Sequence, residues 1–229
     1  MTLSEFNIPF DVAPFKLTGR VYGTLLNHRT ALEAIAEVAE KPPYNALPRA
    51  PVLFIKPRNT LALCNDLIEV PAGVEELEVA GTLGLVIGCS ASRVSEDRAL
   101  EHIAGYLIVN DVSVPHSSYH RPSVRQKARD GFCPLGPAVT PRKWSGDPDA
   151  LTIRTYIDGA LVQSMNTAQL NRSTKRLLAD VTEFMALSPG DVLAVGAAAP
   201  APRARAGQIV TIEIDGLGRL SNPLVRGMD

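Results

Sequence analysis

The feature that most constrains the fold is a succession of short β-rich segments, each closed by glycine, proline or an Asp-Gly turn. Residues 151–156 alternate apolar and polar side chains, and Asp158-Gly159 follows them, which predicts a tight hairpin into a strand at 160–163. The segment 209–214 leads in the same way into Asp215-Gly-Leu-Gly218. Strands and helices do not alternate regularly, so a doubly wound sheet is excluded. The pattern predicts a mixed, mainly antiparallel β fold with a few peripheral helices.

Other segments extend this prediction along the chain. Helices are predicted over about 30–40 with Thr30 as the N-cap, over 95–102 with Ser95 as the N-cap, and over 173–187. Residues 1–17 are predicted to form an arm and 18–226 a single domain, ending in a short strand and a flexible tail. Further strands are predicted from apolar, β-rich runs at 21–26, 52–55, 83–87, 106–109 and 192–195.

Composition and charge exclude several classes of protein. Hydrophobic residues make up 45% of the 229-residue chain and the formal net charge is −1, which suits a globular domain with a sizeable core. No basic tract indicates a nucleic-acid or anionic membrane surface, and Arg203-Ala-Arg205 is interpreted as part of a solvated loop. No apolar run approaches the roughly 18 residues that a transmembrane helix needs.

The cysteines and the first residues indicate the compartment. Cys64, Cys89 and Cys133 are an odd number without paired spacing, which argues against a disulfide framework or a zinc site. The segment 1–17 lacks the basic and apolar regions of a signal peptide. We therefore expect a protein of the reducing cytoplasm.

The segment 105–137 contains the residue types that site chemistry requires. A predicted strand ends in Asn110-Asp111, and a loop carrying Lys127 follows it. Asp111 is either a ligand or substrate contact, or a cap of the following turn through its own backbone. His116 and His120 have the spacing of a helical zinc site, but the neighbouring prolines favour loop histidines. Cys133 is interpreted as a packing residue and not as a nucleophile.

Several short motifs together resemble one known superfamily, the fumarylacetoacetate hydrolases, over about 19–225. The resemblance implies a β-sandwich or β-roll with flanking helices, which assembles into dimers or larger oligomers. The matching pieces are Leu25-Leu-Asn27, Phe54-Ile-Lys-Pro57, Val86-Ile-Gly88, Gly105-Tyr106, Asn110-Asp-Val-Ser113, Arg129-Asp-Gly-Phe-Cys-Pro-Leu-Gly-Pro137, Leu187-Ser-Pro-Gly-Asp191 and Gly216-Leu-Gly-Arg-Leu220.

Within the superfamily the chain is most similar to the N-terminal repeat of the isomerase/decarboxylase group of 4-hydroxyphenylacetate catabolism. Its two repeats are fused in some bacteria and form separate subunits in others. The resemblance implies decarboxylation of 5-oxopent-3-ene-1,2,5-tricarboxylate to 2-hydroxyhepta-2,4-dienedioate, which tautomerises to 2-oxohept-3-enedioate. It also implies a homodimer, or a hetero-oligomer with a C-terminal-type subunit.

Both steps place negative charge on the 2-oxo oxygen, which a divalent cation can stabilise. The resemblance implies Mg²⁺ or Mn²⁺, held by a Glu-x-Glu pair and by the aspartate of the Asn-Asp pair. Alignment on Gly88 places the two glutamate positions at Ala80 and Thr82, so that only Asp111 remains. Glu78 lies two residues too early, about 6–7 Å along a strand. The resemblance therefore predicts a degenerate metal site.

The same resemblance assigns Lys127 to the substrate and makes Lys127 and Asp111 the predicted catalytic pair. Predicted substrate-binding residues are Arg58, Arg121, Arg129 and Asp130, the arginines through bidentate contacts with carboxylates.

Two alternatives remain open. Because the glutamates are replaced, the chain is either an active subunit or a non-catalytic scaffold for a metal-binding C-terminal partner. A third reading, an acylpyruvate-type C–C hydrolase, is disfavoured, since the histidine and glutamate of hydrolytic members fall on Ala31 and Ala34.

Overall fold

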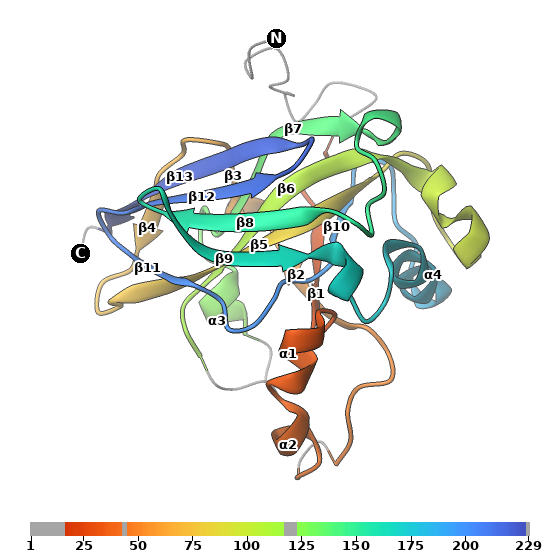
Figure 1. The fold of residues 1–229 in the computed structure, drawn as a ribbon, viewed down its shortest axis with the longest axis horizontal. Helices are drawn as coiled ribbons and strands as arrows, with labels where there is room; N and C mark the ends of the chain where they lie inside the picture. The colour runs from red at the N-terminus through yellow and green to blue at the C-terminus, as the bar shows by residue number, and fades with distance from the viewer. Residues whose placement is uncertain (1–16, 43–44, 117–122, 228–229) are drawn as a thin grey trace.

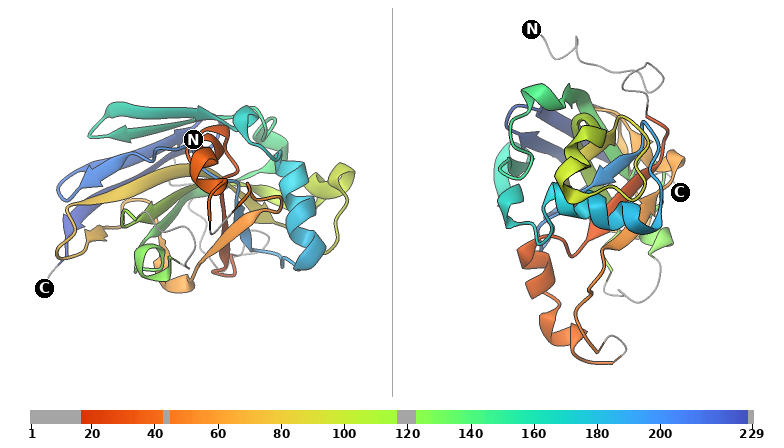
Figure 2. Two further views of the ribbon diagram at one scale, coloured as in Figure 1. Left: turned by 90° about the horizontal axis from the view of Figure 1, so that it is seen from below. Right: turned by 90° about the vertical axis from the view of Figure 1, so that its right-hand side faces the viewer.

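The computed structural model describes residues 17–42, 45–116 and 123–227, and in these ranges the chain forms two β-sheets. The larger sheet has the order β2-β1-β10-β5-β6-β7-β3, with β11 also paired to β5, and the smaller has the order β4-β13-β12-β8-β9. Figures 1 and 2 show the two sheets stacked as layers. The larger sheet contains β1 (Val21–Leu25), β2 (Val52–Lys56), β3 (Leu61–Ala62), β5 (Glu76–Ile87), β6 (Ile103–Ser113), β7 (Cys133–Pro141), β10 (Val192–Ala194) and β11 (Arg203–Arg205); the smaller contains β4 (Ile68–Val70), β8 (Thr152–Ile157), β9 (Ala160–Asn166), β12 (Ile209–Ile214) and β13 (Gly218–Arg226).

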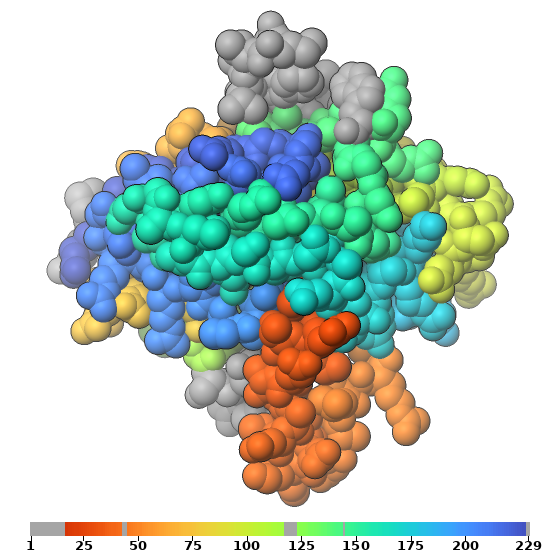
Figure 3. Space-filling model, in the orientation of Figure 1, coloured from red at the N-terminus to blue at the C-terminus, as the bar shows by residue number. Residues whose placement is uncertain are grey.

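The helices are short and lie at the periphery. The first two lie in a projection at the lower edge of the molecule in Figures 1 and 3. No described helix is long and apolar enough to cross a membrane. The helices are α1 (Arg29–Glu33), α2 (Ala36–Ala39), α3 (Val124–Lys127) and α4 (Thr174–Phe184), with 3₁₀ turns η2 (Arg58–Thr60), η3 (Glu96–His102), η4 (Arg142–Trp144) and η5 (Thr167–Gln169).

The main core fills the space between the sheets and one side of α4. It combines side chains from the inner faces of both sheets with the apolar face of α4, and all of them are removed from solvent. Burial on this scale is the dominant stabilising term for a domain of this size. The contributors include Leu83, Leu85, Tyr106 and Ile108 of the larger sheet, Ile153, Ile212 and Ile214 of the smaller, and Leu177, Leu178 and Val181 of α4.

The predicted fold class is confirmed. The hairpin at Asp158-Gly159 joins β8 to β9, with φ of 51° and 81° at the two turn residues, as its sequence requires. Ser173 caps α4, and its side chain accepts a hydrogen bond from the Arg176 amide. The strands at 83–87 and 106–109 are present but are the centres of the longer strands β5 and β6.

Several local predictions were wrong. His28, not Thr30, is the N-cap of α1, because its Nδ1 accepts from the Thr30 amide. The helix predicted over 30–40 is two short helices that are interrupted near Ile35. The strand predicted as short after 218 is β13, which is nine residues long, and residues 228–229 of the predicted tail lie outside the described residues. The predicted arm lies almost wholly outside the described residues.

Candidate active site

A cavity of about 340 Å³ lies where the ends of β5 and β6 meet α1 and the loop 196–202. The antiparallel register places Ala80 opposite Asp111 and Glu78 opposite Ser113. Because side chains two residues apart in a strand share a face, these four positions border the same space. The remaining walls come mainly from Leu25, Leu26, Ala31, Ala34, Ile35, His116, Lys127, Ala197, Ala198, Ala199 and Arg203.

Two lysines hold the carboxylate of Asp111. Lys127, at the end of α3, donates from Nζ to Asp111 Oδ2 at 2.7 Å, and Lys56 Nζ lies 2.9 Å from Oδ1. Burial alone would raise the pKa of Asp111, but the two ammonium groups outweigh it and hold that pKa below its ordinary value. The structure therefore brings together the predicted pair, Asp111 and Lys127, and keeps the carboxylate ionised.

Lys56 is a fixed, buried charge. Its side chain is 1% exposed, and Nζ donates to the carbonyls of Val112, Lys127 and Phe132 at 2.6, 3.0 and 2.8 Å. Burial lowers the pKa of Lys56, while the nearby Asp111 opposes that shift. Three acceptors require three N–H groups, which only the ammonium form has. Its contact with Asp111 is therefore electrostatic, and Oδ1 accepts no hydrogen bond from any described residue.

Lys127 is positioned from a second side by an aromatic ring. Its Nζ lies 4.5 Å from the centroid of the Phe54 ring, a favourable cation–π distance. Phe54 is paired with Gly23 across β1 and β2, and a Cβ at Gly23 would lie 2.0 Å from Phe54 Cζ. The absence of a side chain at Gly23 thus leaves the space in which the ring supports Lys127.

The replacement Gly23→Ala should displace the Phe54 ring and destabilise the protein by about 1–3 kcal/mol, as overpacking typically does. Urea unfolding measures the change. Adding Phe54→Leu should recover part of the loss, because the two positions share one space. A Gly23→Ala protein as stable as the wild type would contradict this account of the packing.

The residues around Asp111 do not fit a divalent cation. Both carboxylate oxygens face ammonium groups, and Ala80 offers no ligand. Thr82 is 2% exposed, and its hydroxyl donates to the carbonyl oxygen of Gly196 at 2.7 Å. Glu78 lies near Arg203, at 3.6 Å. Over the described ranges no three His, Cys, Asp or Glu side chains form a cluster that could hold a metal ion. Hard cations need several oxygen ligands, which this arrangement does not supply.

The α1 side of the cavity is apolar. Ala31 and Ala34, the positions to which the resemblance assigns the histidine and glutamate of hydrolytic members, both border the cavity. The nearby His28 is 1% exposed and caps α1, and Glu33 is exposed to solvent. Burial lowers the pKa of His28. Neither residue is among those that line the cavity, so among the described residues the α1 side of the cavity presents no base for activating water.

The predicted substrate-binding residues lie elsewhere or outside the described residues. Arg129 and Asp130 border a separate cavity of about 420 Å³, and Asp130 accepts from Asn59 Nδ2 at 2.6 Å. Arg58 packs beside Gly19, and the cavity that contains Asp111 is not bordered by it. Arg121 lies outside the described residues. The structure therefore brings none of the described three to Asp111, and a role for them in binding stays a prediction.

Sequence reasoning missed four residues of this site: Lys56, Glu78 as a wall residue, His116 and Arg203. Arg203 was assigned to a solvated loop, whereas it begins β11, pairs with Glu78 and borders the cavity. No local signal marked Lys56, because a lysine that ends the apolar run Val52–Ile55 has the pattern of a solvent-facing residue. His116 borders the cavity, and His120 lies outside the described residues, so their predicted loop arrangement stays a prediction.

Cys133 is fully buried in β7, and burial raises the pKa of its thiol to about 12. It therefore stays protonated at neutral pH, which agrees with a packing role and not with a nucleophile.

Comparison with known proteins gives consistent matches. The family model described as fumarylacetoacetate (FAA) hydrolase C-terminal matches residues 20–225. The chain is 43% identical over 209 residues to a 4-hydroxyphenylacetate degradation bifunctional isomerase/decarboxylase of Salmonella dublin. That match covers 91% of this chain and 48% of the relative, so the chain spans about half the length of the curated relative.

Solved structures agree with this match. One is 2-hydroxyhepta-2,4-diene-1,7-dioate isomerase from Mycobacterium marinum, with a TM-score of 0.77, 30% identity, and coverage of 93% of this chain and 77% of that one. Another is maleylpyruvate hydrolase from Sphingobium sp. SYK-6 in complex with manganese(II) and pyruvate, with a TM-score of 0.75, 25% identity, and coverage of 94% and 72%. Proteins with this fold therefore include one that binds a divalent metal.

Proposed function

Because the chain belongs to the fumarylacetoacetate hydrolase family, we propose that it is an isomerase/decarboxylase subunit of the N-terminal type, acting on 2-oxo and 2-hydroxy dicarboxylates. The observation that carries the proposal is the Asp111–Lys127 pair at the wall of the cavity. The names of the relatives and of the similar isomerase structure support the substrate class.

The chemistry that suits this pair is proton transfer through a dienolate. In the tautomerisation of 2-hydroxyhepta-2,4-dienedioate, the proton leaves the C2 hydroxyl and a proton is added at C5. The double bonds at C2 and C4 become a C2 ketone and a C3=C4 double bond. An ammonium that faces the C2 oxygen stabilises the charge that develops there. Lys127 is the group placed to do so, because one of its three protons is engaged by Asp111 and it lines the cavity.

Decarboxylation of the tricarboxylate passes through the same kind of dienolate, since the electron pair left by carbon dioxide delocalises onto the 2-oxo oxygen. The same ammonium would serve both steps. Lys56 compensates the charge of Asp111 from the buried side, which leaves Lys127 able to interact with substrate. No step in this scheme is assigned to a metal ion.

Only one observation favours the alternative of a non-catalytic scaffold, namely that Ala80 and Thr82 replace the expected metal-binding glutamates. Against it stands the network of Lys56, Lys127 and Asp111, because burying three charged groups at and behind a cavity wall is costly and such groups cluster at functional sites. Hydrolysis is favoured less, because Ala31 and Ala34 occupy the wall where a water-activating pair would lie.

The proposal includes a partner and a compartment. Since the chain spans about half of its curated relative, a second superfamily subunit of the C-terminal type is the partner that we propose. The three cysteines are unpaired thiols, which fits a reducing cytoplasm.

The test is turnover of 2-hydroxyhepta-2,4-dienedioate by the purified chain, followed by loss of dienol absorbance. We expect isomerisation that persists in excess EDTA and is not increased by Mg²⁺ or Mn²⁺, because Asp111 is neutralised by lysines. Complete loss of activity on chelation, with recovery on adding metal, would contradict the metal-independent site. Activity that appears only on mixing with a C-terminal-type subunit, and that survives Lys127→Met, would establish the scaffold instead.

A further inference from the structure

The cavity has a second cationic group, Arg203, whose side chain donates no hydrogen bond to any residue that the structure describes. Its side chain is 55% exposed, and its nearest carboxylates are Glu78 at 3.6 Å and Glu76 at 4.0 Å. These distances are too long for hydrogen bonds, and Arg203 donates none to a described side chain. Arg205, two residues along β11, instead donates twice to Glu76, at 2.9 and 2.7 Å. Arg203 therefore has donors available for an incoming oxyanion, whereas the guanidinium of Arg205 is engaged.

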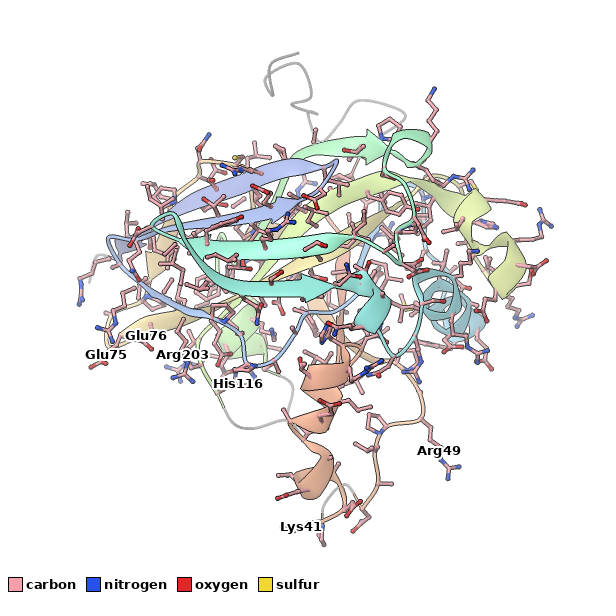
Figure 4. The ribbon with its side chains drawn as sticks, in the orientation of Figure 1. Lys41, Arg49, Glu75, Glu76, His116 and Arg203 are labelled. Atoms are coloured by element: carbon pink, nitrogen blue, oxygen red, sulfur yellow. The ribbon has the colours of Figure 1, made fainter. Side chains whose placement is uncertain are left out.

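Arg203 and the Asp111–Lys127 pair are offset along the sheet. Arg203 lies opposite Glu78 on one side of β5, and Asp111 lies opposite Ala80 on the other. Two residues along an antiparallel strand correspond to about 7 Å. Figure 4 shows Arg203 at the lower edge of the molecule, with Glu76 and His116 on the same edge. The cavity thus has cationic groups at two separate places.

The charges and surfaces of the cavity suit a particular ligand. At one end Lys56 and Lys127 exceed the single charge of Asp111, and at the other end Arg203 lies 3.6 Å from Glu78 and 4.0 Å from Glu76 without a hydrogen bond to either. Much of the rest of the cavity wall is apolar and includes Leu25, Leu26, Ile35 and Ala197–Ala199. A molecule with two anionic ends and a flat, apolar middle matches this distribution.

We propose that Arg203 determines specificity by binding the remote carboxylate of a dicarboxylate whose 2-oxo end lies at Lys127. The inference rests on the proposed function for the orientation of the ligand, and it adds the residue that separates dicarboxylates from monocarboxylates. An arginine that exchanges two long ionic contacts for a bidentate carboxylate contact gains charge-assisted hydrogen bonds. Glu76 and Glu78 hold the guanidinium near the cavity until the ligand arrives.

The test measures binding without turnover. Isothermal titration calorimetry compares 2-oxoheptanedioate with 2-oxoheptanoate, which has the same chain length but lacks the remote carboxylate. For the wild type we expect the dicarboxylate to bind about 10- to 100-fold more tightly, the range for hydrogen bonds to charged groups. Arg203→Met should reduce dicarboxylate affinity to that of the monocarboxylate and leave monocarboxylate affinity unchanged. Arg203→Lys should recover part of the difference.

Arg98→Met is the matched control, since it removes an exposed arginine that is paired with a carboxylate, Glu101, and does not border the cavity. It should leave the affinities for both ligands at wild-type values, and unchanged thermal unfolding would confirm that each variant is folded. Equal affinity of the wild type for the two ligands, no detectable binding of the dicarboxylate, or equal effects of Arg203→Met and Arg98→Met would each overturn the inference.

Failure of the proposed function is distinguishable from failure of this inference. A chain that lacks isomerase activity but retains Arg203-dependent selectivity would refute the function and leave the binding role standing. A chain that turns over the dienedioate but binds both probes equally would support the proposed function and refute the role of Arg203.

Discussion

Replacing Lys127 with methionine is expected to lower kcat/KM for the isomerisation by about 10²–10³, the usual effect of removing one donor from a developing oxyanion. Methionine retains much of the length and the apolar stem of lysine, so contact with the Phe54 ring is largely preserved. The loss should fall mainly on kcat, because the charge that Lys127 stabilises develops in the transition state. Initial rates over a range of substrate concentrations separate the two parameters.

Lys175→Met provides the control for this measurement. Lys175 is an exposed residue on α4 that does not border the cavity, and its replacement should leave both kcat and KM unchanged. A second check is thermal unfolding, since Lys127→Met also removes one partner of Asp111. A folded Lys127→Met protein with wild-type kcat would refute the role of the ammonium group.

The second large effect is on stability. Lys56→Met is expected to reduce the free energy of unfolding by about 3–5 kcal/mol, the range for breaking a buried ion pair from one side. Burial disfavours the ammonium form of Lys56, but its removal leaves three carbonyls without their donor and Asp111 with a single lysine. Unsatisfied buried acceptors each carry a desolvation penalty, which accounts for the size of the expected loss.

Urea unfolding monitored by circular dichroism measures this loss. The double variant Lys56→Met with Asp111→Asn should be less destabilised than the sum of the two single variants, because the second change removes the charge that the first leaves uncompensated. Lys175→Met should change the free energy of unfolding by less than about 0.5 kcal/mol. A Lys56→Met protein within that margin of the wild type would show that the three carbonyls find other donors.

Local patterns were sufficient to predict the hairpin at Asp158-Gly159 and the start of α4. In both cases the signal is local, since the turn requires positive φ and the serine oxygen accepts a nearby amide hydrogen. The start of α1 was not predictable from propensity, because histidine is not a preferred cap and acts as one here through its Nδ1. Likewise β11 is short, and only its pairing with β5 distinguishes it from a loop.

Some residues of the candidate site were predicted from the sequence and others were not. Asp111 and Lys127 were predicted together from the superfamily resemblance, and the structure places them 2.7 Å apart between nitrogen and oxygen. Lys56 was not, because a lysine that ends an apolar strand has the pattern of a solvent-facing residue. Its burial depends on carbonyls contributed by β6 and by the segment 127–132, a non-local arrangement. Arg129 and Asp130 belong to the same motif as Lys127 but border another cavity.

The pairing of β4 with β13 has a consequence for how the protein acquires its structure. This parallel pair joins Ile68–Val70 to Leu224–Arg226, and β13 also lies between β4 and β12 in the smaller sheet. During synthesis, more than a hundred residues are added after β4 before its partner strand emerges from the ribosome. Such distant pairings slow folding, because the entropy of closing the loop is lost before the contact forms. Completion of the smaller sheet, and with it the burial of the inner face of the larger one, is therefore a late event that requires the chain through Arg226.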